Sequence, residues 1–504
     1  MKIKLFATSD VHGNVSPYKY SDRSLAEAGL ARLATYIRQH KDEDTILIDN
    51  GDLLQGSPLC YHHHLYNEED VNPVVHVLNE LDYDYFNIGN HDFNYGQEVL
   101  YHGMQVMDAK CITTNITDGT HRFEYDYVIH QIKGVKIALV GLTNDYIPNW
   151  EIPSHITGLS FENAYTKCAS VVEKIKKNNE ADYIVVVYHG GFEKNFDGTP
   201  LNTPSHDNQG YRIVSEIEGI DVLITGHQHR TICQNIHNTF VTQTAQNGME
   251  LAHIEIDTDT REITGQLILA DSDIDQRVMG IIQKEEEATQ TWLDEPVGGF
   301  DIGDCLISDE MDARIHKHSC VSFLNQIQKD YYQADCSASA LFNDAFGFNH
   351  QITMRDIVST YVYPNTIIMV KITGKNLKAY LEQAAKYFDV KDQEVVISKD
   401  YCDPKPIHYE YDMVDGVDYV IKVGNPVGER IENLMFNGKE IAEDQELTFV
   451  VNNYRLAGGG NYTMLDECEV LKDDGKEMVE IIAEYIMKNN PVVIDHKDNI
   501  KVIV

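Results

Sequence analysis

The chain has 504 residues, of which 80 are acidic and 41 are basic, so its formal net charge is -39. A charge of this sign argues against duplex nucleic acid or an anionic membrane surface as the partner. The nine cysteines include no CxxC pair, which argues against a disulfide framework or a thiolate zinc site and favours a reducing, cytoplasmic setting. The first residues form too short an apolar run for a signal peptide, and no stretch is long and apolar enough to cross a membrane.

The first part of the chain alternates between predicted strands and predicted helices. Positions 26–40, for example, place Leu30, Leu33, Ala34 and Ile37 on one face, as an amphipathic helix requires. Strands are predicted at 4–9, 45–49, 85–88 and 111–114, and helices at 26–40, 74–81 and 97–107. This alternation predicts a mostly parallel sheet.

The pattern changes after position 125, where two apolar runs on either side of Gly134 predict a hairpin. The expected elements are strands at 125–132, 135–142, 183–188 and 222–225, further strands near Phe240, Ile254 and Leu267, and a helix at 161–177. Two sheets packed face to face with helices outside fit this mixture better than one doubly wound sheet. We therefore predict an α/β fold whose first domain, 1–270, contains two facing sheets.

The middle of the chain predicts a connection between two domains. Positions 271–293 are strongly helical, carry three consecutive glutamates at 285–287, and precede Pro296 and Gly298. We predict a linker helix over 271–298 and a second α/β domain over 299–504. That domain is expected to contain helices at 313–332 and 374–387 and strands at 367–372 and 447–452.

Five loops carry residues that bind metals, and each loop follows an apolar run predicted to be a buried strand. Their candidate ligands are Asp10 and His12, Asp52, Asn90, His189, and His227 with His229. Open α/β sheets bind ligands at the C-terminal ends of their strands, so these loops are expected to meet at one edge. Asp52, in the stretch DNGDLLQGSP, is the natural centre of such a site.

Seven oxygen and imidazole donors are too many for one tetrahedral ion and suit two ions that share a carboxylate. We assign one ion to Asp10, His12 and His229, the other to Asn90, His189 and His227, and Asp52 to both. Two divalent cations roughly 3.5–4 Å apart can clamp a phosphoryl group and acidify a water nucleophile. Mn, Zn, Fe and Co all remain candidates.

The other histidines near these loops are interpreted differently. His91 has no place in either ligand set, and beside Asn90 it could face the substrate and donate a proton to a leaving oxygen, although a structural histidine is the alternative. The run His62, His63 and His64 follows no predicted strand end. We predict that this run lies in an exposed loop.

The order of the motifs DxH, GDxxxGxP, GNHxF, H and GHxH resembles the calcineurin-like metallophosphoesterase domain, and the second domain resembles the C-terminal domain of the 5'-nucleotidase family. The resemblance covers nearly the whole chain. It implies a four-layer αββα sandwich with two metals, followed by an α/β substrate-binding domain that supplies an aromatic clamp for a nucleobase. Within the family the chain is most similar to the 2',3'-cyclic-nucleotide 2'-phosphodiesterase/3'-nucleotidase branch, through GNHDFNYG at 89–96, YPNTIIMVKITGK at 363–375 and NNYRLAGG at 452–459.

The resemblance also implies substrate contacts in the second domain. Tyr411 and Tyr454 match the two aromatic positions that sandwich the base, where stacking contributes roughly 1–3 kcal/mol per base. On sequence alone, a tyrosine in either segment is more often a core residue than a clamp. The further candidate contacts are Asn365, Arg455, Gly458 and Gly459.

Three departures from the 5'-nucleotidase pattern favour cyclic and 3' substrates. Asn94 stands where 5'-nucleotidases carry an Asp that orients the catalytic histidine, so we expect it to act with His91 and to leave His91 a weaker cation. Gly460 stands where they have an Asp that grips the ribose hydroxyls, and a carboxylate there would repel a 2',3'-cyclic phosphate. The Gly-Gly-x-Arg phosphate loop is missing from SASALFND at 337–344, and Arg455 is a candidate substitute.

Together these features predict a dinuclear-metal phosphoesterase that hydrolyses 2',3'-cyclic nucleotides to 3'-nucleotides and 3'-nucleotides to nucleosides. A small nucleotide is the expected partner, and the oligomeric state is left open. The alternative in the same class is a 5'-nucleotidase or a nucleotide-sugar hydrolase. The alternative of another class is a non-catalytic nucleotide-binding protein, which the presence of His91 beside all seven ligands disfavours.

Overall fold

The chain folds into two units, Met1–Gln290 and Thr291–Val504. The computed structural model describes residues 1–68, 70–119, 123, 125–199, 207–363, 365–403, 405–456 and 458–504. Across these ranges, no helix combines the length and the apolar character that crossing a bilayer would require.

The first unit contains two six-stranded sheets. One has the order β14-β13-β1-β2-β3-β4, with β1 (Lys2–Thr8), β2 (Thr45–Asp49), β3 (Tyr85–Phe86), β4 (Lys110–Cys111), β13 (Glu250–Asp257) and β14 (Ile263–Leu269). The other has the order β11-β12-β10-β9-β7-β6, with β6 (Val128–Ile132), β7 (Val135–Thr143), β9 (Tyr183–His189), β10 (Val222–Thr225), β11 (Ile232–Ile236) and β12 (Thr239–Gln243). Strands β1 to β4 run parallel, as do β7, β9, β10 and β12. The remaining strands, β6, β11, β13 and β14, pair antiparallel with their neighbours.

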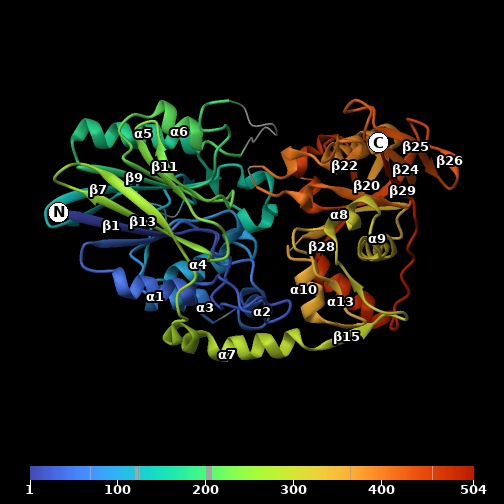
Figure 1. Ribbon diagram of the computed structural model, residues 1–504, viewed down its shortest axis with the longest axis horizontal. Helices are drawn as coiled ribbons and strands as arrows, with labels where there is room; N and C mark the ends of the chain where they lie inside the picture. The colour runs from blue at the N-terminus through green and yellow to red at the C-terminus, as the bar shows by residue number, and fades with distance from the viewer. Residues whose placement is uncertain are drawn as a thin grey trace. The chain divides into compact units, whose positions relative to one another are not determined.

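The two sheets face each other with helices on their outer sides, which gives four layers (Figure 1). Fully buried residues such as Leu5 and Ile48 from the first sheet and Val187 from the second pack into one core between the sheets. The helices are α1 (Leu30–His40), α2 (Pro58–Asn67), α3 (Pro73–Glu80), α4 (Gln97–Val106), α5 (Ala164–Asn178) and α6 (Gly210–Glu216). A short hairpin joins β5 (Ile116–Thr117) to β8 (Ser160–Phe161). The predicted αββα sandwich is therefore confirmed.

The histidine run at positions 62–64 lies in helix α2 rather than in an exposed loop, so that prediction is wrong. Pro58 occupies the first turn of α2, and Ser57 caps it by accepting a hydrogen bond from Cys60 N at 3.3 Å. His62 and His63 are 8% and 3% exposed. Proline in the first turn and serine at the cap are a helix-start signal, which outweighs the polar character of the histidines.

Helix α7 (Gln276–Leu293) occupies the region of the predicted linker, and the boundary between the units falls inside it, after Gln290. It is attached to the first unit by side chains rather than standing free. Glu286 accepts hydrogen bonds from Ser16 Oγ at 3.0 Å and Tyr20 Oη at 2.8 Å, and Glu285 lies 3.1 Å from His63 Nδ1. Two of the three glutamates of the predicted linker helix therefore contact side chains of the first unit.

The second unit is built on a five-stranded sheet, β23-β17-β27-β20-β28, beside a four-stranded sheet, β26-β25-β24-β29. The strands of the two sheets are β17 (Cys336–Ala340), β20 (Thr366–Thr373), β23 (Asp412–Asp415), β24 (Asp418–Lys422), β25 (Ile431–Phe436), β26 (Lys439–Glu440), β27 (Glu446–Asn452), β28 (Glu469–Glu477) and β29 (Ile500–Ile503). Two-stranded ladders pair β15 (Pro296–Gly299) with β19 (Gln351–Thr353), β16 (Cys305–Leu306) with β18 (Gly347–Phe348), and β21 (Phe388–Lys391) with β22 (Glu394–Ile397). The predicted strands at 367–372 and 447–452 are the neighbours β20 and β27.

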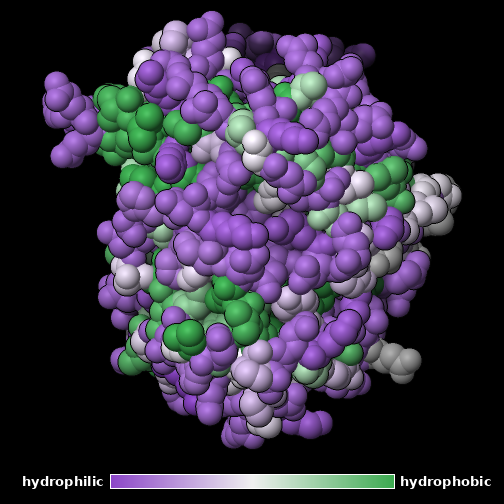
Figure 2. All heavy atoms as spheres, turned by 90° about the vertical axis from the view of Figure 1, so that its right-hand side faces the viewer, coloured by the Kyte–Doolittle hydropathy of each residue, from purple (hydrophilic) through white to green (hydrophobic). Residues whose placement is uncertain are grey.

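The helices of this unit are α8 (Glu310–Ile315), α9 (Ser319–Tyr332), α10 (Met354–Thr360), α11 (Gly374–Ala384), α12 (Asn453–Leu456) and α13 (Met478–Lys488). The single helix predicted at 313–332 is interrupted at Lys317, whose backbone is left-handed with φ 48°. The buried Lys317 amine donates to Asp415 and Asn499, and these contacts hold the break open. The face seen in Figure 2 is mainly hydrophilic with separate hydrophobic patches, as the acidic composition leads one to expect.

Candidate metal centre

The candidate ligands follow the C-terminal ends of parallel strands in both sheets of the first unit. Asp10 and His12 follow β1, Asp52 follows β2, Asn90 follows β3, His189 ends β9, and His227 and His229 follow β10. The register aligns Thr8 with Asp49 and Thr225 with Tyr188, so strand ends within each sheet coincide. The structure brings all seven predicted ligands to one edge of the sandwich.

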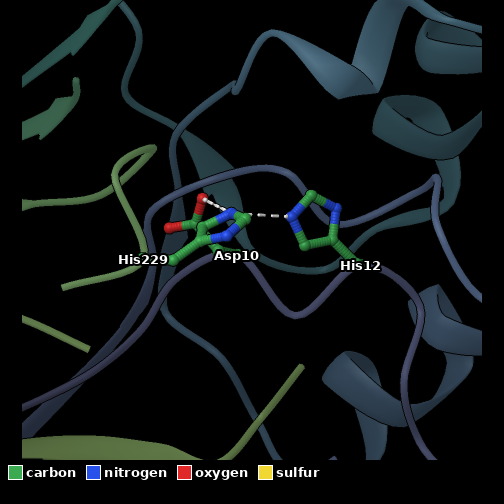
Figure 3. Close-up of side chains that lie close together, drawn as sticks. All are labelled: Asp10, His12 and His229. Carbon is green, nitrogen blue, oxygen red and sulfur yellow. Dashed lines mark hydrogen bonds and ion pairs between the residues drawn. The ribbon is translucent and has the colours of Figure 1, made fainter. Parts of the chain in front are cut away.

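The first group of donors contains Asp10, His12 and His229, which point toward one another (Figure 3). His229 Nε2 lies 3.3 Å from Asp10 Oδ1 and 3.2 Å from His12 Nε2. His12 Nδ1 lies 3.1 Å from the carbonyl oxygen of Gln55. If Nδ1 donates its proton to that carbonyl, the lone pair on His12 Nε2 faces the same point as the Asp10 carboxylate.

The second group contains Asp52, His189 and His227, with Asn90 beside it. His189 Nε2 lies 3.2 Å from Asp52 Oδ2, and His227 Nδ1 lies 2.8 Å from Asn90 Oδ1. His189 Nδ1 lies 2.7 Å from the carbonyl oxygen of Asn50, which orients this imidazole as Gln55 orients His12. A backbone carbonyl that binds the outer ring nitrogen is the usual support of a metal-binding histidine.

The donor atoms of the second group fit a divalent cation better than they fit one another. Asp52 Oδ2 and His189 Nε2 are buried, and no described residue supplies either atom with a hydrogen bond of good geometry. Buried polar atoms of native proteins are normally satisfied, so such an orphaned pair requires an explanation. Oxygen and imidazole donors in two adjacent groups are the chemistry that Mn, Zn, Fe or Co accepts.

The electrostatics of the site point the same way. Burial disfavours the His189 imidazolium, but the carboxylates of Asp52 and Asp10 outweigh burial and raise the pKa of His189 to about 10. Burial also disfavours ionised Asp52, yet His189 and His91 hold the pKa of Asp52 well below its usual range. A site whose carboxylates retain a proton on a buried imidazole is one in which a metal cation can take that proton's place.

The backbone at the site is unusual, because five of the seven candidate ligands have left-handed conformations. The φ angles are 54° at Asp10, 51° at His12, 56° at Asp52, 67° at His227 and 53° at His229. Non-glycine residues seldom adopt this region, and strain of this kind gathers at functional sites. The local cost is tolerated where the chain must turn sharply to direct each side chain at one point.

Two glycines make room for the ligands. A Cβ atom at Gly89 would lie 2.2 Å from Asp52 Oδ1, and one at Gly226 would lie 2.4 Å from Ser9 Oγ and 2.8 Å from Asp10 Oδ2. Any larger residue would displace the carboxylates. The glycines in GNH and GHxH are therefore required for close approach rather than for turning.

His91 lies at the edge of the donor groups and belongs to neither. Its backbone N–H donates to Asp52 Oδ1 at 2.7 Å, its Nδ1 lies 2.7 Å from Asn94 Oδ1, and its ring lies 5.3 Å from that of His12. The predicted partnership of Asn94 with His91 is thus present as a hydrogen bond. His91 is placed to contact a substrate held between the two donor groups.

Sequence reasoning missed several residues that support the site. Asp92 accepts hydrogen bonds from the backbone N–H groups of Asp52, Leu53, Leu54 and Gly89, and so organises two ligand loops at once. Asp207 Oδ2 lies 2.9 Å from His227 Nε2, Trp150 stacks on the His227 ring at 5.3 Å, and Glu151 contacts Asn94. Asp92 adjoins a recognisable motif, but the other three lie far from any motif.

Two of the substrate contacts predicted in the second unit do not fit the structure. Tyr411 is 0% exposed and its ring stacks on Tyr387 at 4.7 Å, so it offers no free face to a base. Arg455 is 1% exposed, and its Nε donates to Asp412 Oδ2 at 2.7 Å, so it serves an internal ion pair rather than a phosphate. The burial of both residues contradicts their predicted roles.

Of the other predicted contacts, Gly459 is buried and the rest keep partial exposure. Tyr454 is half-buried and lies over Gly459, where a Cβ atom would come within 2.4 Å of the Tyr454 ring. Gly458 and Asn365 are also half-buried. Tyr409, two residues before Tyr411, is half-buried too, and its carbonyl accepts from Arg455 Nη2 at 2.6 Å. Tyr409 is therefore a better candidate than Tyr411 for the partner of Tyr454.

Comparison with known proteins gives consistent results for both units. The sequence model "Calcineurin-like phosphoesterase" matches residues 3–231, and "5'-nucleotidase, C-terminal domain" matches residues 301–467. A crystal structure of a candidate 5'-nucleotidase from Staphylococcus aureus, in complex with alpha-ketoglutarate, is 33% identical over 100% of both chains, with a TM-score of 0.93.

Curated relatives are more distant. The chain is 28% identical to the 2',3'-cyclic-nucleotide 2'-phosphodiesterase/3'-nucleotidase of Salmonella typhimurium, over 91% of this chain and 81% of that protein. It is 26% identical to the trifunctional nucleotide phosphoesterase protein YfkN of Bacillus subtilis, over 97% of this chain but only 38% of that longer protein. It is 21% identical to the 5'-nucleotidase of Vibrio vulnificus, over 97% of this chain and 91% of that protein.

The sandwich and its edge of carboxylates and imidazoles define a metal-dependent phosphoester hydrolase. Enzymes of this class use divalent metals, and the two donor groups of this chain are suited to hold them. The chain belongs to the calcineurin-like phosphoesterases that carry a 5'-nucleotidase C-terminal domain. The resemblance seen in the sequence is therefore confirmed.

Proposed function

We propose that this enzyme hydrolyses 2',3'-cyclic nucleotides to 3'-nucleotides and 3'-nucleotides to nucleosides, with two divalent cations in the donor groups. The observation that carries the proposal is the pair of adjacent donor groups with His91 beside them. Asp10, His12 and His229 would hold one ion, Asn90, His189 and His227 the other, and Asp52 both. When bound, such cations supply Lewis acidity toward a phosphoryl group and acidify water.

The residues of the chain supply positioning and proton transfer. Hydrolysis of the cyclic ester adds a water oxygen to phosphorus and breaks the bond from phosphorus to the 2'-oxygen, which must then take up a proton. His91 is held by its backbone N–H and its Nδ1, so it would act as the imidazolium: Nδ1–H donates to Asn94 Oδ1, and Nε2–H gives up the proton to the leaving oxygen. The water that attacks releases a proton in turn, which restores His91.

The specificity for cyclic and 3' substrates is supported by the second unit and by relatives. Residue 460 is a glycine, so it brings no carboxylate that would repel a phosphate at the 2' and 3' positions. Its φ of 71°, and the 3.0 Å that would separate a Cβ atom from Arg455 Nη1, also disfavour a side chain there. Three curated relatives of 25–28% identity bear the cyclic phosphodiesterase name. We propose Tyr454 and Tyr409 as the residues that stack on the base.

A second candidate is a 5'-nucleotidase, which is favoured by the 33% identity to the Staphylococcus aureus protein, itself a candidate 5'-nucleotidase. The two activities differ in which ester of the ribose reaches the metal centre. A nucleotide-sugar hydrolase belongs to the same alternative. A non-catalytic nucleotide-binding protein would keep the tyrosines but would not need both donor groups and His91 together.

The test is a turnover panel on metal-loaded protein with 2',3'-cyclic AMP, 3'-AMP, 5'-AMP and a nucleotide sugar. The proposal expects release from the first two to exceed release from 5'-AMP by at least about tenfold in kcat/KM. Faster release from 5'-AMP or from the nucleotide sugar would favour the second candidate. If the protein bound these nucleotides but hydrolysed none of them with manganese, zinc, iron or cobalt supplied, the result would favour a non-catalytic nucleotide-binding protein.

We also propose that the enzyme works in the cytoplasm. All nine cysteines, each of which lies in the described part of the chain, are free thiols, which suits a reducing compartment. Subcellular fractionation with antibody detection tests this, and recovery of the protein outside the cytoplasm would contradict it.

A further inference from the structure

We propose that Glu151 is a positioning residue for His91 and that it acts through the side-chain amide of Asn94. The proposal rests on the proposed function, because it assumes that His91 acts on the substrate. Glu151 follows strand β7 and the short 3-10 helix η2 (Ile147–Asn149), far from every motif in the sequence.

The contacts form one continuous chain. His91 Nδ1 lies 2.7 Å from Asn94 Oδ1, and Asn94 Nδ2 donates to Glu151 Oε2 at 2.8 Å. The other oxygen, Glu151 Oε1, accepts from Ile152 N at 2.8 Å and lies 2.9 Å from His155 Nδ1. The Glu151 side chain is 5% exposed, so water does not compete strongly for these contacts.

This chain fixes which ring nitrogen of His91 carries a proton. An ionised carboxylate only accepts hydrogen bonds, so Glu151 requires the NH₂ end of the Asn94 amide to face it. The oxygen end of Asn94 then faces His91 Nδ1, and an oxygen there requires a proton on Nδ1. Glu151 thus sets the orientation of an amide that would otherwise be free to flip, and through it the tautomer of His91.

Asn94 and Glu151 therefore form a matched pair. An Asp at position 94 would face His91 equally well, but its second oxygen would lie about where Asn94 Nδ2 now lies, 2.8 Å from the Glu151 carboxylate. Two carboxylates at that separation cannot both ionise easily. In this chain the carboxylate that supports His91 does not contact it directly. It belongs to Glu151 and acts through the Asn94 amide that lies between them.

The segment around Glu151 is anchored independently of Asn94. Glu151 N donates to the carbonyl oxygen of Ile147 at 3.0 Å, and the neighbouring Trp150 stacks on the His227 ring at 5.3 Å with an interplanar angle of 19°. The same short segment therefore contacts a candidate metal ligand and the support of His91. This anchoring allows Glu151 to impose an orientation on Asn94 rather than to follow it.

The experiment is a double-mutant cycle of Glu151→Gln and Asn94→Asp, with the exposed Glu173→Gln on α5 as the control. Glu151→Gln keeps Oε1 for Ile152 N but presents an NH₂ group to Asn94, which favours the flipped amide. The NH₂ end of Asn94 then opposes a proton on His91 Nδ1 and so disfavours the imidazolium that acts as the acid. Asn94→Asp alone brings two carboxylates together. Each single variant should lower kcat at least about tenfold with little change in KM, and by no more than the 10²–10⁴-fold that general acid–base catalysis contributes.

The double variant should recover most of the lost kcat, because the NH₂ group introduced at position 151 then donates to the carboxylate introduced at position 94, and that carboxylate accepts from His91 Nδ1. Rescue by a second mutation is a result that a merely structural role of Glu151 would not give. Equal kcat in both single variants and wild type, or a double variant no better than the worse single variant, would overturn the proposal.

A second readout does not depend on activity or on metal. In metal-free protein labelled with ¹⁵N-histidine, at a pH at which the His91 ring is neutral, the His91 signals, identified by their loss in His91→Gln, should show the remaining proton on Nδ1 in the wild type and on Nε2 in Glu151→Gln. An unchanged tautomer would overturn the role of Glu151 even if a variant were too unstable for kinetics. If the wild type hydrolysed no phosphoester, the proposed function would fail while this spectrum still decided the orientation of Asn94.

Discussion

His189 Nε2 lies 3.2 Å from Asp52 Oδ2 at full burial, and no described residue gives either atom a hydrogen bond of good geometry. An imidazole and a carboxylate that face each other in this way are arranged for a cation between them and their neighbours. We therefore predict that metal binding depends most on Asp52.

Asp52→Asn should abolish hydrolysis of every substrate, because the amide keeps the shape of the side chain but loses the charge that we assign to both ions. We expect less than about one thousandth of the wild-type kcat and a marked loss of bound metal, since removal of one catalytic ligand forfeits much of the Lewis acidity. Phosphate release and metal content by elemental analysis measure the two effects. Asp82→Asn, at an exposed left-handed turn, is the control, and full metal content with normal turnover in Asp52→Asn would contradict the assignment.

His91→Gln should lower kcat by about 10²–10⁴-fold and leave metal content unchanged. The backbone N–H of residue 91 would still donate to Asp52 Oδ1, so the loop should keep its shape while the proton donor is lost. Substrates with a leaving group that needs no proton, such as a nitrophenyl ester, should be affected less. An equal loss on both kinds of substrate would show that His91 does not act as the acid.

The sequence allowed the metal centre to be located because its residues lie where elementary rules put them. Parallel strands end together, and Asp10, Asp52 and His227 each follow a strongly apolar strand, so their convergence needs no knowledge of side-chain packing. Glu151 and Asp207 could not be found in this way. Each lies in an irregular loop and gains its role only from a neighbour brought close by the fold.

Burial explains the wrong predictions in the second unit and in helix α2. Tyr411 has the residue type of a clamp, but it follows the 3-10 helix η6 (His408–Glu410) and its ring packs on Tyr387 in the core. No local sequence pattern distinguishes it from Tyr409. Arg455 has a charge that could bind phosphate, but it forms a buried ion pair with Asp412, the first residue of β23. His63 lies in a run of polar residues, which predicts an exposed position. It is nevertheless buried, because Glu285 of helix α7, far along the chain, pairs with it.

Asp207→Asn should weaken metal binding at the group that contains His227. His227 Nδ1 lies beside Asn90 and its Nε2 lies 2.9 Å from Asp207 Oδ2, so Asp207 supports the outer nitrogen of a ligand imidazole. Loss of such a support typically costs 10–100-fold in metal affinity. Titration of metal-free protein by calorimetry measures the change, with the exposed Asp197→Asn as the control. Unaltered affinity in Asp207→Asn would mean that the contact is incidental.

Arg455→Met should destabilise the second unit without the signature of a lost substrate contact. The Arg455 guanidinium and Asp412 carboxylate are both almost fully buried, and removal of one partner from a buried pair typically costs about 3–5 kcal/mol. Urea unfolding measures the loss. Arg355→Met, which breaks the more exposed pair with Asp294, should cost about 1 kcal/mol or less. A raised KM with unchanged stability in Arg455→Met would restore Arg455 as a phosphate ligand.

Asp49→Asn should change how stability depends on pH. Asp49 is fully buried at the end of β2, where it accepts from Thr8 Oγ1 at 2.7 Å and Gly51 N at 3.0 Å, and burial raises its pKa to about 7. Between about pH 4 and 7 the folded protein therefore holds a proton that the unfolded chain has released, so this residue makes stability fall as pH rises and then level off above pH 7.

The amide introduced at position 49 would not ionise, so the stability of Asp49→Asn relative to wild type should rise from pH 4 to 7, by up to roughly 4 kcal/mol if the shift is fully expressed. Unfolding of both metal-free proteins at several pH values measures the difference in their free energies of unfolding. Contributions from Asp10 and Asp52 cancel in this difference when these residues titrate equally in both proteins. The exposed Asp108→Asn is the control. A difference that stays constant over this window would mean that Asp49 is ionised in the folded protein from about pH 4 upward, and that its hydrogen bonds to Thr8 and Gly51 offset its burial.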